Sequence, residues 1–305
     1  MIIKLLNIII LLIVPFIMAG IIRRTKAFWA GRKGAPILQP LYDFLRLLKK
    51  EFVISTTTTS VFKITPIIVI TTVFFASLFV PLCTGEAMIN VPCGFVIFSY
   101  ILGLGKFMSL LSSMDTGSSF EGMGASREAC FTTIIEPAFF VTLASIMLVT
   151  QNYTFDSLNE MILSSSNYGI LIIAFTVLIL FLMIIVEGSR VPVDDPTTHL
   201  ELTMIHEVMI LDNSALDLAF LTWANSIKMF LFSSLIAAII IPSGLSLIAS
   251  IALYLLILLV ISIAIGTLES AMARIRMSHV FEFIFVLNSL SLVVLSLAVA
   301  SGFGG

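Results

Sequence analysis

Eight long apolar runs constrain this chain more than any other feature of its sequence. Each run is close to the roughly 20 residues that a helix needs to cross the hydrocarbon core of a bilayer. Because lipid offers no partners to backbone polar groups, such runs fold as helices whose hydrogen bonds close internally. The predicted spans are residues 2–22, 61–82, 91–113, 130–150, 168–187, 217–241, 244–268 and 279–301.

The composition supports the same fold class. Hydrophobic residues make up 59% of the 305 residues, whereas soluble domains are nearer half apolar. We therefore expect an all-α integral membrane protein, with residues 1–305 forming a single multi-span domain. A net charge of −2 gives no argument for nucleic-acid binding.

The sixteen Lys and Arg residues predict the orientation of the spans. Eight of them fall in the first loop, and the other loop cations fall in the third, fifth and seventh loops. The positive-inside rule places these loops in the cytoplasm and both termini outside, in the cell membrane. The predicted cytoplasmic loops are residues 23–60, 114–129, 188–216 and 269–278.

The first loop carries an amphipathic segment within residues 36–51. Leu41, Phe44, Leu45 and Leu48 follow helical spacing, with charged residues between them. Such a helix lies at the membrane surface, either as an interfacial anchor or as a docking surface for a cytoplasmic partner. The sequence leaves both interpretations open.

The loop at residues 188–216 concentrates the ionisable residues. The stretch from Glu187 to Asp217 holds seven of the eighteen acidic residues and two of the three histidines. Groups of this kind change proton affinity in response to nearby charge, so the loop has the components of a proton relay. The alternative is a solvated acidic loop. The candidate relay residues here are Glu187, Arg190, Asp194, Asp195, His199, Glu201, His206 and Glu207.

Further ionisable residues lie within or at the ends of the predicted spans. Intramembrane charges are costly unless they are paired or face water, and they commonly mark ion paths. Four join the relay candidates: Lys106, Glu136, Lys228 and Glu282. Snorkelling to the interface is the alternative for the two lysines. Because these charges belong to the cytoplasmic half, we expect a half-path or internal cavity and no complete channel.

The sequence predicts no metal or redox centre on this chain. Its cysteines, Cys83, Cys93 and Cys130, lack the close pairing of a zinc or iron–sulfur site. Whether Cys83 and Cys93 pair with each other is left open.

Three of the predicted cytoplasmic loops carry long motifs. The first of these loops contributes Arg32-Lys33-Gly-Ala-Pro-Ile-Leu-Gln39 and Asp43. The second contributes Asp115-Thr-Gly-Ser-Ser-Phe and Gly124-Ala-Ser-Arg127-Glu128, followed by Glu136-Pro137. The third contributes Glu187-Gly-Ser-Arg-Val-Pro-Val-Asp194. Together these motifs resemble the complex I subunit 1 family. The segment after the third motif, residues 196–207, looks like the membrane-bound nickel–iron hydrogenase and formate hydrogenlyase branch, because Thr197 and His199 replace acids of the quinone enzymes.

The resemblance implies a subunit that joins a cytoplasmic redox arm to antiporter-like membrane subunits and couples redox events to proton or sodium translocation. Nickel–iron and iron–sulfur centres are then expected on hydrogenase-like large and small partner subunits. Loop residues implied at the partner interface are Arg32, Lys33, Gln39, Asp43, Asp115, Arg127 and Glu128.

Three alternatives remain. The chain is the quinone-site subunit of an NADH:quinone oxidoreductase-type complex, a secondary transporter, or an inert membrane anchor. Against the transporter, the sequence shows no inverted repeat of broken helices.

Overall fold

The computed structural model describes residues 2–83, 85–152, 154–155, 158, 169–194, 205–242 and 244–303. In this part of the chain the regular structure is helical. The helices are α1 (Ile2–Trp29), α2 (Gln39–Leu47), α3 (Ser60–Ser77), α4 (Gly94–Asp115), α5 (Ser119–Thr150), α6 (Gly169–Glu187), α7 (His206–Met209), α8 (Ala215–Ile240), α9 (Leu247–Ala271) and α10 (Met277–Phe303).

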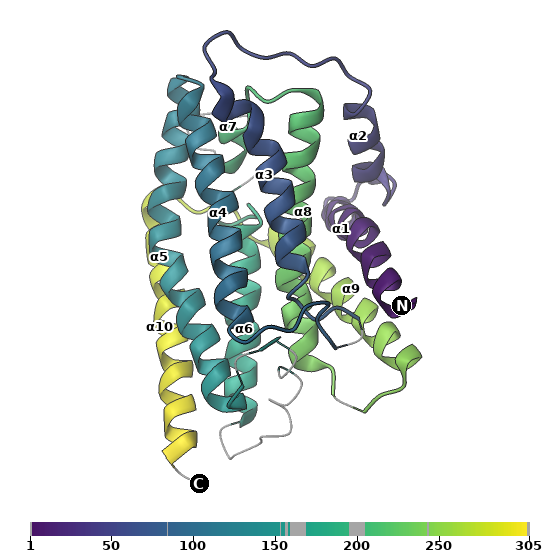
Figure 1. Cartoon of the computed structure of the whole chain (residues 1–305), viewed down its shortest axis with the longest axis vertical. Coiled ribbons are helices and arrows are strands. Elements are labelled where there is room, and N and C mark those ends of the chain that lie inside the picture. The colour runs from purple at the N-terminus through teal and green to yellow at the C-terminus, as the bar shows by residue number, and fades with distance from the viewer. Residues whose placement is uncertain are drawn as a thin grey trace.

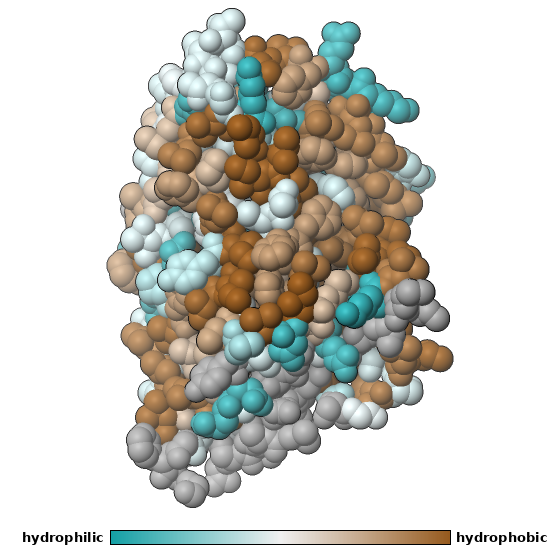
Figure 2. All heavy atoms as spheres, viewed as in Figure 1, coloured by the Kyte–Doolittle hydropathy of each residue, from teal (hydrophilic) through white to brown (hydrophobic). Residues whose placement is uncertain are grey.

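Eight of the described helices, all except α2 and α7, are long and apolar enough to cross a membrane. The prediction of an all-α, eight-span membrane protein is confirmed. The two short helices α2 and α7 lie at one end of the bundle, and α10 ends at the opposite end (Figure 1). Apolar residues cover much of the middle of the face seen in Figure 2.

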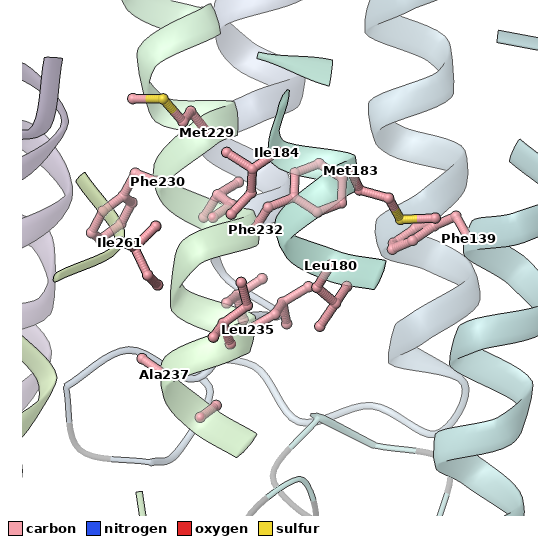
Figure 3. Close-up of a cluster of buried hydrophobic side chains, with 14 of the residues drawn as sticks. Phe139, Leu180, Met183, Ile184, Met229, Phe230, Phe232, Leu235, Ala237 and Ile261 are labelled. Atoms are coloured by element: carbon pink, nitrogen blue, oxygen red, sulfur yellow. The ribbon is translucent and has the colours of Figure 1, made fainter. Parts of the chain in front are cut away.

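Helix α8 occupies the centre of the bundle. It contacts α1, α2, α3, α6 and α9, while α5 pairs with α10 along the side. Side chains of α6 and α8 meet in the core, with Phe139 from α5 and Ile261 from α9 completing the cluster (Figure 3). Since lipid and protein interior are equally apolar, close packing holds such a bundle together.

Small residues permit the tightest helix contacts. A Cβ built on Gly105 of α4 would lie 2.5 Å from the hydroxyl of Thr72 on α3. A Cβ on Gly20 of α1 would collide with the backbone carbonyl of Ile37, which precedes α2. These glycines let α4 approach α3 and let the start of α2 rest on α1.

The amphipathic helix of the first loop is α2. None of its residues is fully buried. Phe44 packs on Trp223 of α8 and Phe16 of α1, with ring centroids 5.0 and 5.4 Å apart. On its other side Tyr42 and Leu45 are exposed.

Two predicted loop boundaries are wrong, and a third predicted loop contains a short helix. The loop expected over residues 23–60 begins later, because α1 continues to Trp29. The loop expected over residues 114–129 is mostly helix, because α5 begins at Ser119. Its polar first turns extend beyond the apolar run and are stabilised by packing, with Gly124 close against Ile205 and Val208. The loop expected over residues 188–216 contains the short helix α7.

Candidate ion-coupling site

Seven side chains form one continuous series of ion pairs, which we call the ion chain. In order they are Lys228, Glu187, Lys106, Glu128, His206, Asp194 and Arg274. They come from α8, α6, α4, α5, α7, the segment after α6 and the connection between α9 and α10. The series therefore ties together elements that are far apart in sequence.

The first half of the ion chain is held by short contacts. Lys228 Nζ lies 3.0 Å from Glu187 Oε2, and Lys106 Nζ lies 2.8 Å from Glu187 Oε1. Lys106 also lies 3.0 Å from Glu128 Oε1. The side chain of Glu128 is only 5% exposed. Each carboxylate thus faces two cationic partners, since His206 is the second partner of Glu128, and this is the condition under which buried charges are tolerated.

His206 joins the two halves of the ion chain. Its Nε2 lies 3.2 Å from Glu128 Oε2, and its Nδ1 lies 3.4 Å from Asp194 Oδ2. Burial by itself disfavours the imidazolium, but the carboxylates of Glu128 and Asp194 outweigh burial and raise the pKa of His206 to about 9. His206 is therefore protonated at neutral pH and acts as a cation between two anions.

Asp194 ends the series of carboxylates. Its Oδ2 accepts hydrogen bonds from the backbone N–H groups of Ile205 and His206, and its Oδ1 lies 3.4 Å from Arg274. Burial alone would raise the pKa of Asp194, but the hydrogen bonds from His206 and the charges of His206 and Arg274 lower it. Asp194 thus fixes the start of α7 and with it the imidazole of His206.

A second buried cluster of charged side chains links α1 to α9. Glu269 Oε2 lies 2.9 Å from Lys26 Nζ, and Glu269 Oε1 lies 3.4 Å from Arg190. The Glu269 side chain is fully buried. This triad and most of the ion chain line the same cavity.

That cavity has a volume of about 610 Å³. One part of its wall is aromatic, where Phe16 stacks on Trp223 with centroids 5.6 Å apart and Phe44 packs beside them. Another part is charged, and the cavity therefore connects an apolar region near α2 with five members of the ion chain. These five are Lys106, Glu128, Glu187, His206 and Lys228.

Glu207 and Glu136 line the cavity without belonging to the ion chain. Burial, then the charge of Asp194, raises the pKa of Glu207. Glu136 is exposed on α5, on a wall shared with a second cavity of about 410 Å³ between α4 and α5.

The structure brings together several of the predicted relay residues. Lys106, Glu187, Asp194, His206 and Lys228 are in the ion chain, and Arg190 is in the triad with Glu269. Glu282, in contrast, is exposed and pairs with His279 at 3.0 Å, so the structure does not place it with the others. Asp195, His199 and Glu201 lie outside the described residues.

The predicted interface residues have mixed positions. Glu128 is buried in the ion chain and is not at the surface as expected. Asp115 accepts hydrogen bonds from the backbone N–H and hydroxyl of Thr59 at the start of α3, which gives it an intramolecular role. Gln39 donates a hydrogen bond to Asp43, which also pairs with Arg23. Arg32 and Lys33 are exposed, and Arg127 is half-buried.

Sequence reasoning missed Arg274, Lys26 and Glu269 as members of charged clusters. The first two appeared as ordinary cytoplasmic cations, and Glu269 as the end of a span. A usable signal was present for Glu269, because a carboxylate at the end of an apolar helix requires a cation. The three cysteines are free, and the buried thiol of Cys83 donates to Asn7 Oδ1 at 3.0 Å.

A protein-family model described as NADH dehydrogenase matches residues 2–299. The chain belongs to the NADH dehydrogenase family. The resemblance inferred from the loop motifs is confirmed, since the family model covers nearly the whole chain.

The sequence of this chain is similar to those of several curated proteins. Hydrogenase-4 component C of Escherichia coli (strain K12) is 26% identical over 275 residues, which cover 88% of this chain and 86% of that protein. Formate hydrogenlyase subunit 4 of the same organism is 24% identical and covers 86% of each chain. An NADH-quinone oxidoreductase subunit of Pelagibacter ubique (strain HTCC1062) is 24% identical, but the match covers only 59% of this chain and 56% of that protein.

A solved structure confirms the fold. The chain resembles a subunit in the "Structure of the membrane-bound sulfane sulfur reductase (MBS), an archaeal respiratory membrane complex". The TM-score is 0.83, the identity is 17%, and the match covers 96% of this chain and 97% of the other.

Proposed function

We propose that this chain is the membrane-anchoring and coupling subunit of a complex I-related, ion-translocating hydrogenase or hydrogenlyase-type complex. Two relatives whose matches span most of both chains bear the names hydrogenase-4 component C and formate hydrogenlyase subunit 4. In this role the chain carries no redox centre. It converts an event in a cytoplasmic redox arm into movement of protons or sodium ions.

The observation that carries this proposal is the ion chain. Its seven alternating charges connect the segment between α9 and α10 to α8 in the bundle core. In such a series the proton affinity of each group depends on its neighbours. A charge change near the cavity therefore alters the protonation of His206 and the pairing of Glu128.

The predicted orientation determines on which side of the membrane each partner subunit would lie. The end with α2 and α7 is the cytoplasmic end, and both termini face outside across the cell membrane. The end of α1 exposes Phe28 and Trp29, at 77% and 62%, followed by the cations Arg32 and Lys33. This apolar and basic surface suits the hydrogenase-like large and small subunits, which would hold the nickel–iron and iron–sulfur centres. Antiporter-like subunits would lie beside the bundle in the membrane.

The test measures ions pumped per electron in the assembled complex carrying Glu187→Gln. Glu187 joins two lysines, so we expect redox turnover to continue while the pumped-ion ratio falls. Glu282→Gln is the matched control, because the Glu282 side chain is 72% exposed and outside the ion chain. An unchanged ratio in Glu187→Gln with the complex intact would favour the inert-anchor alternative.

A second candidate function is supported by the aromatic wall of the cavity. A lipid quinone needs an apolar tunnel and a hydrogen-bond donor for its carbonyl group. The buried indole N–H of Trp223 has no hydrogen-bond partner among the described residues, and it sits among Phe16, Phe44 and Phe74. Purification through a tag on this chain separates the two functions: hydrogen-linked dye reduction supports the first, and quinone-linked reduction without nickel supports the second.

A further inference from the structure

Helix α5 contains a proline at a place where the chain also carries a membrane carboxylate. Pro137 lies inside this 32-residue helix, directly after Glu136. Proline has no N–H group, so the carbonyl of Thr133 lacks its usual helical donor, and the ring pushes against that turn. In membrane helices the backbone groups loosened by proline are satisfied by neighbouring helices and side chains.

Asn288 of α10 contacts this turn from the neighbouring helix. Its side-chain Nδ2 donates to the carbonyl of Ile134 at 2.8 Å and to the carbonyl of Ile284 in its own helix at 3.1 Å. Ile134 is in the turn that Pro137 disturbs, and its carbonyl is the neighbour of the one that proline leaves without a donor. One amide group therefore connects the α5 turn before Pro137 to a fixed point on α10.

The same turn carries Glu136 on a wall between two cavities. Ser99 and Gly103 of α4, together with Glu136 and Phe139 of α5, line both the larger cavity and the second cavity. A small change in the angle of α5 at Pro137 would move Glu136 relative to Gly103. The position of this carboxylate thus depends on how the turn before Pro137 is held.

We propose that Asn288 is a positioning residue that holds the α5 turn before Pro137 and so fixes the Glu136 carboxylate at the shared cavity wall. The inference rests on the proposed function and deepens it. It names a residue that positions Glu136, one of the candidate relay groups. Asn288 acts through the backbone of α5 and does not itself take part in ion transfer.

The first experiment measures position without using activity. Glu136→Cys is introduced into the assembled complex after Cys83→Ala, Cys93→Ser and Cys130→Ser, and its reaction rate with a water-soluble thiol reagent is followed. Adding Asn288→Leu is expected to change this rate about threefold or more, the scale set by one interhelical hydrogen bond in a membrane protein. Ser289→Ala is the control, because that hydroxyl donates within α10, to the carbonyl of Phe285.

Two further variants keep the test decisive. Where Asn288→Leu prevents assembly, Asn288→Ser withdraws the amide donor and leaves a smaller, polar side chain. In a Pro137→Ala background the effect of removing Asn288 should shrink, because the restored N–H can bond the carbonyl of Thr133 and support this turn from within α5. A labelling rate equal to that of the Ser289→Ala control, or an effect of the same size with and without Pro137, would overturn the inference.

Pumping measurements separate this inference from the proposed function. A fall in ions pumped per electron in both Glu136→Gln and Asn288→Leu supports both. A fall in Glu136→Gln, with Asn288→Leu unchanged in labelling and pumping, overturns the role of Asn288 and leaves the coupling function standing. If neither variant alters pumping, Glu136 has no part in coupling, and the labelling rate still decides whether Asn288 positions the helix.

Discussion

Asp194 contacts His206 at both its backbone nitrogen and its imidazole ring. Its Oδ2 atom lies 3.0 Å from the backbone nitrogen of His206 and 3.4 Å from the imidazole Nδ1. The backbone contact fixes where the histidine begins α7, and the ring contact fixes which way the imidazole points. The other ring nitrogen lies 3.2 Å from Glu128 Oε2.

This geometry predicts a pH-dependent contribution of His206 to stability. Its pKa rises from 6.5 to about 9 in the folded protein, so the stabilisation is complete below pH 6.5 and is lost as the pH rises through about 9. His206→Gln should cost on the order of 3 kcal/mol at low pH and almost nothing above pH 9 or so. Melting temperatures of the two purified proteins across this range test it, with His279→Gln as the exposed control.

Lys106 is expected to be the member of the ion chain whose loss costs most stability. It is the cation shared by Glu128 and Glu187. Lys106→Met leaves each of these carboxylates with one cationic partner in place of two. Breaking a buried ion pair in this way costs about 3–5 kcal/mol. Thermal unfolding in detergent measures the loss, and Lys63→Met, at an exposed position on α3, is the control. Adding Glu187→Gln to Lys106→Met should recover part of the loss, and a further additive loss would contradict this account.

Glu207 is predicted to destabilise the folded protein when it is charged. Its pKa is raised above 4.5, so folding favours the protonated form and stability falls as the pH rises past that value. Glu207→Gln should therefore be more stable than the natural protein at neutral pH, and the difference should vanish below about pH 4. Thermal unfolding at both pH values measures the difference. A variant less stable than the natural protein at neutral pH would show that Glu207 has a stabilising cation partner.

Gly20 should not tolerate a larger side chain. A Cβ at this position would collide with the carbonyl of Ile37, so Gly20→Ala must displace the segment that leads into α2. We expect a loss of about 1–3 kcal/mol, as for other overpacked sites. Gly103→Ala is the control, since a Cβ there meets nothing within 4 Å. Proteolysis of the first loop would report the displacement directly, and equal cleavage in both variants would refute it.

The spanning helices were predictable because their signal is local. About twenty consecutive apolar residues have one stable conformation in lipid, whatever their neighbours are. The start of α5 was not predictable in this way, because residues 119–129 are largely polar or small and their helix depends on packing against α7. Composition alone made that stretch look like a loop.

The candidate site was predictable in its members but not in its pairings. Glu187, Asp194 and His206 stood out by charge and by family motif, yet nothing in the sequence pairs Lys106 with Glu187 or Arg274 with Asp194. The partners in each pair are about 80 residues apart, and their contacts depend on how the helices are arranged. Glu128 was assigned to the partner interface because it belongs to the motif of the second predicted cytoplasmic loop, whereas the structure buries it beside Lys106.

The ion chain contains three carboxylates, two lysines, one arginine and one histidine. Its total charge is therefore zero when the imidazole of His206 is neutral and one positive unit when it is protonated. The other six groups balance one another and cannot absorb that unit. A single proton thus decides whether the ion chain is balanced or carries a net positive charge, and an anion that enters the cavity would compete with Glu128 for the imidazolium of His206.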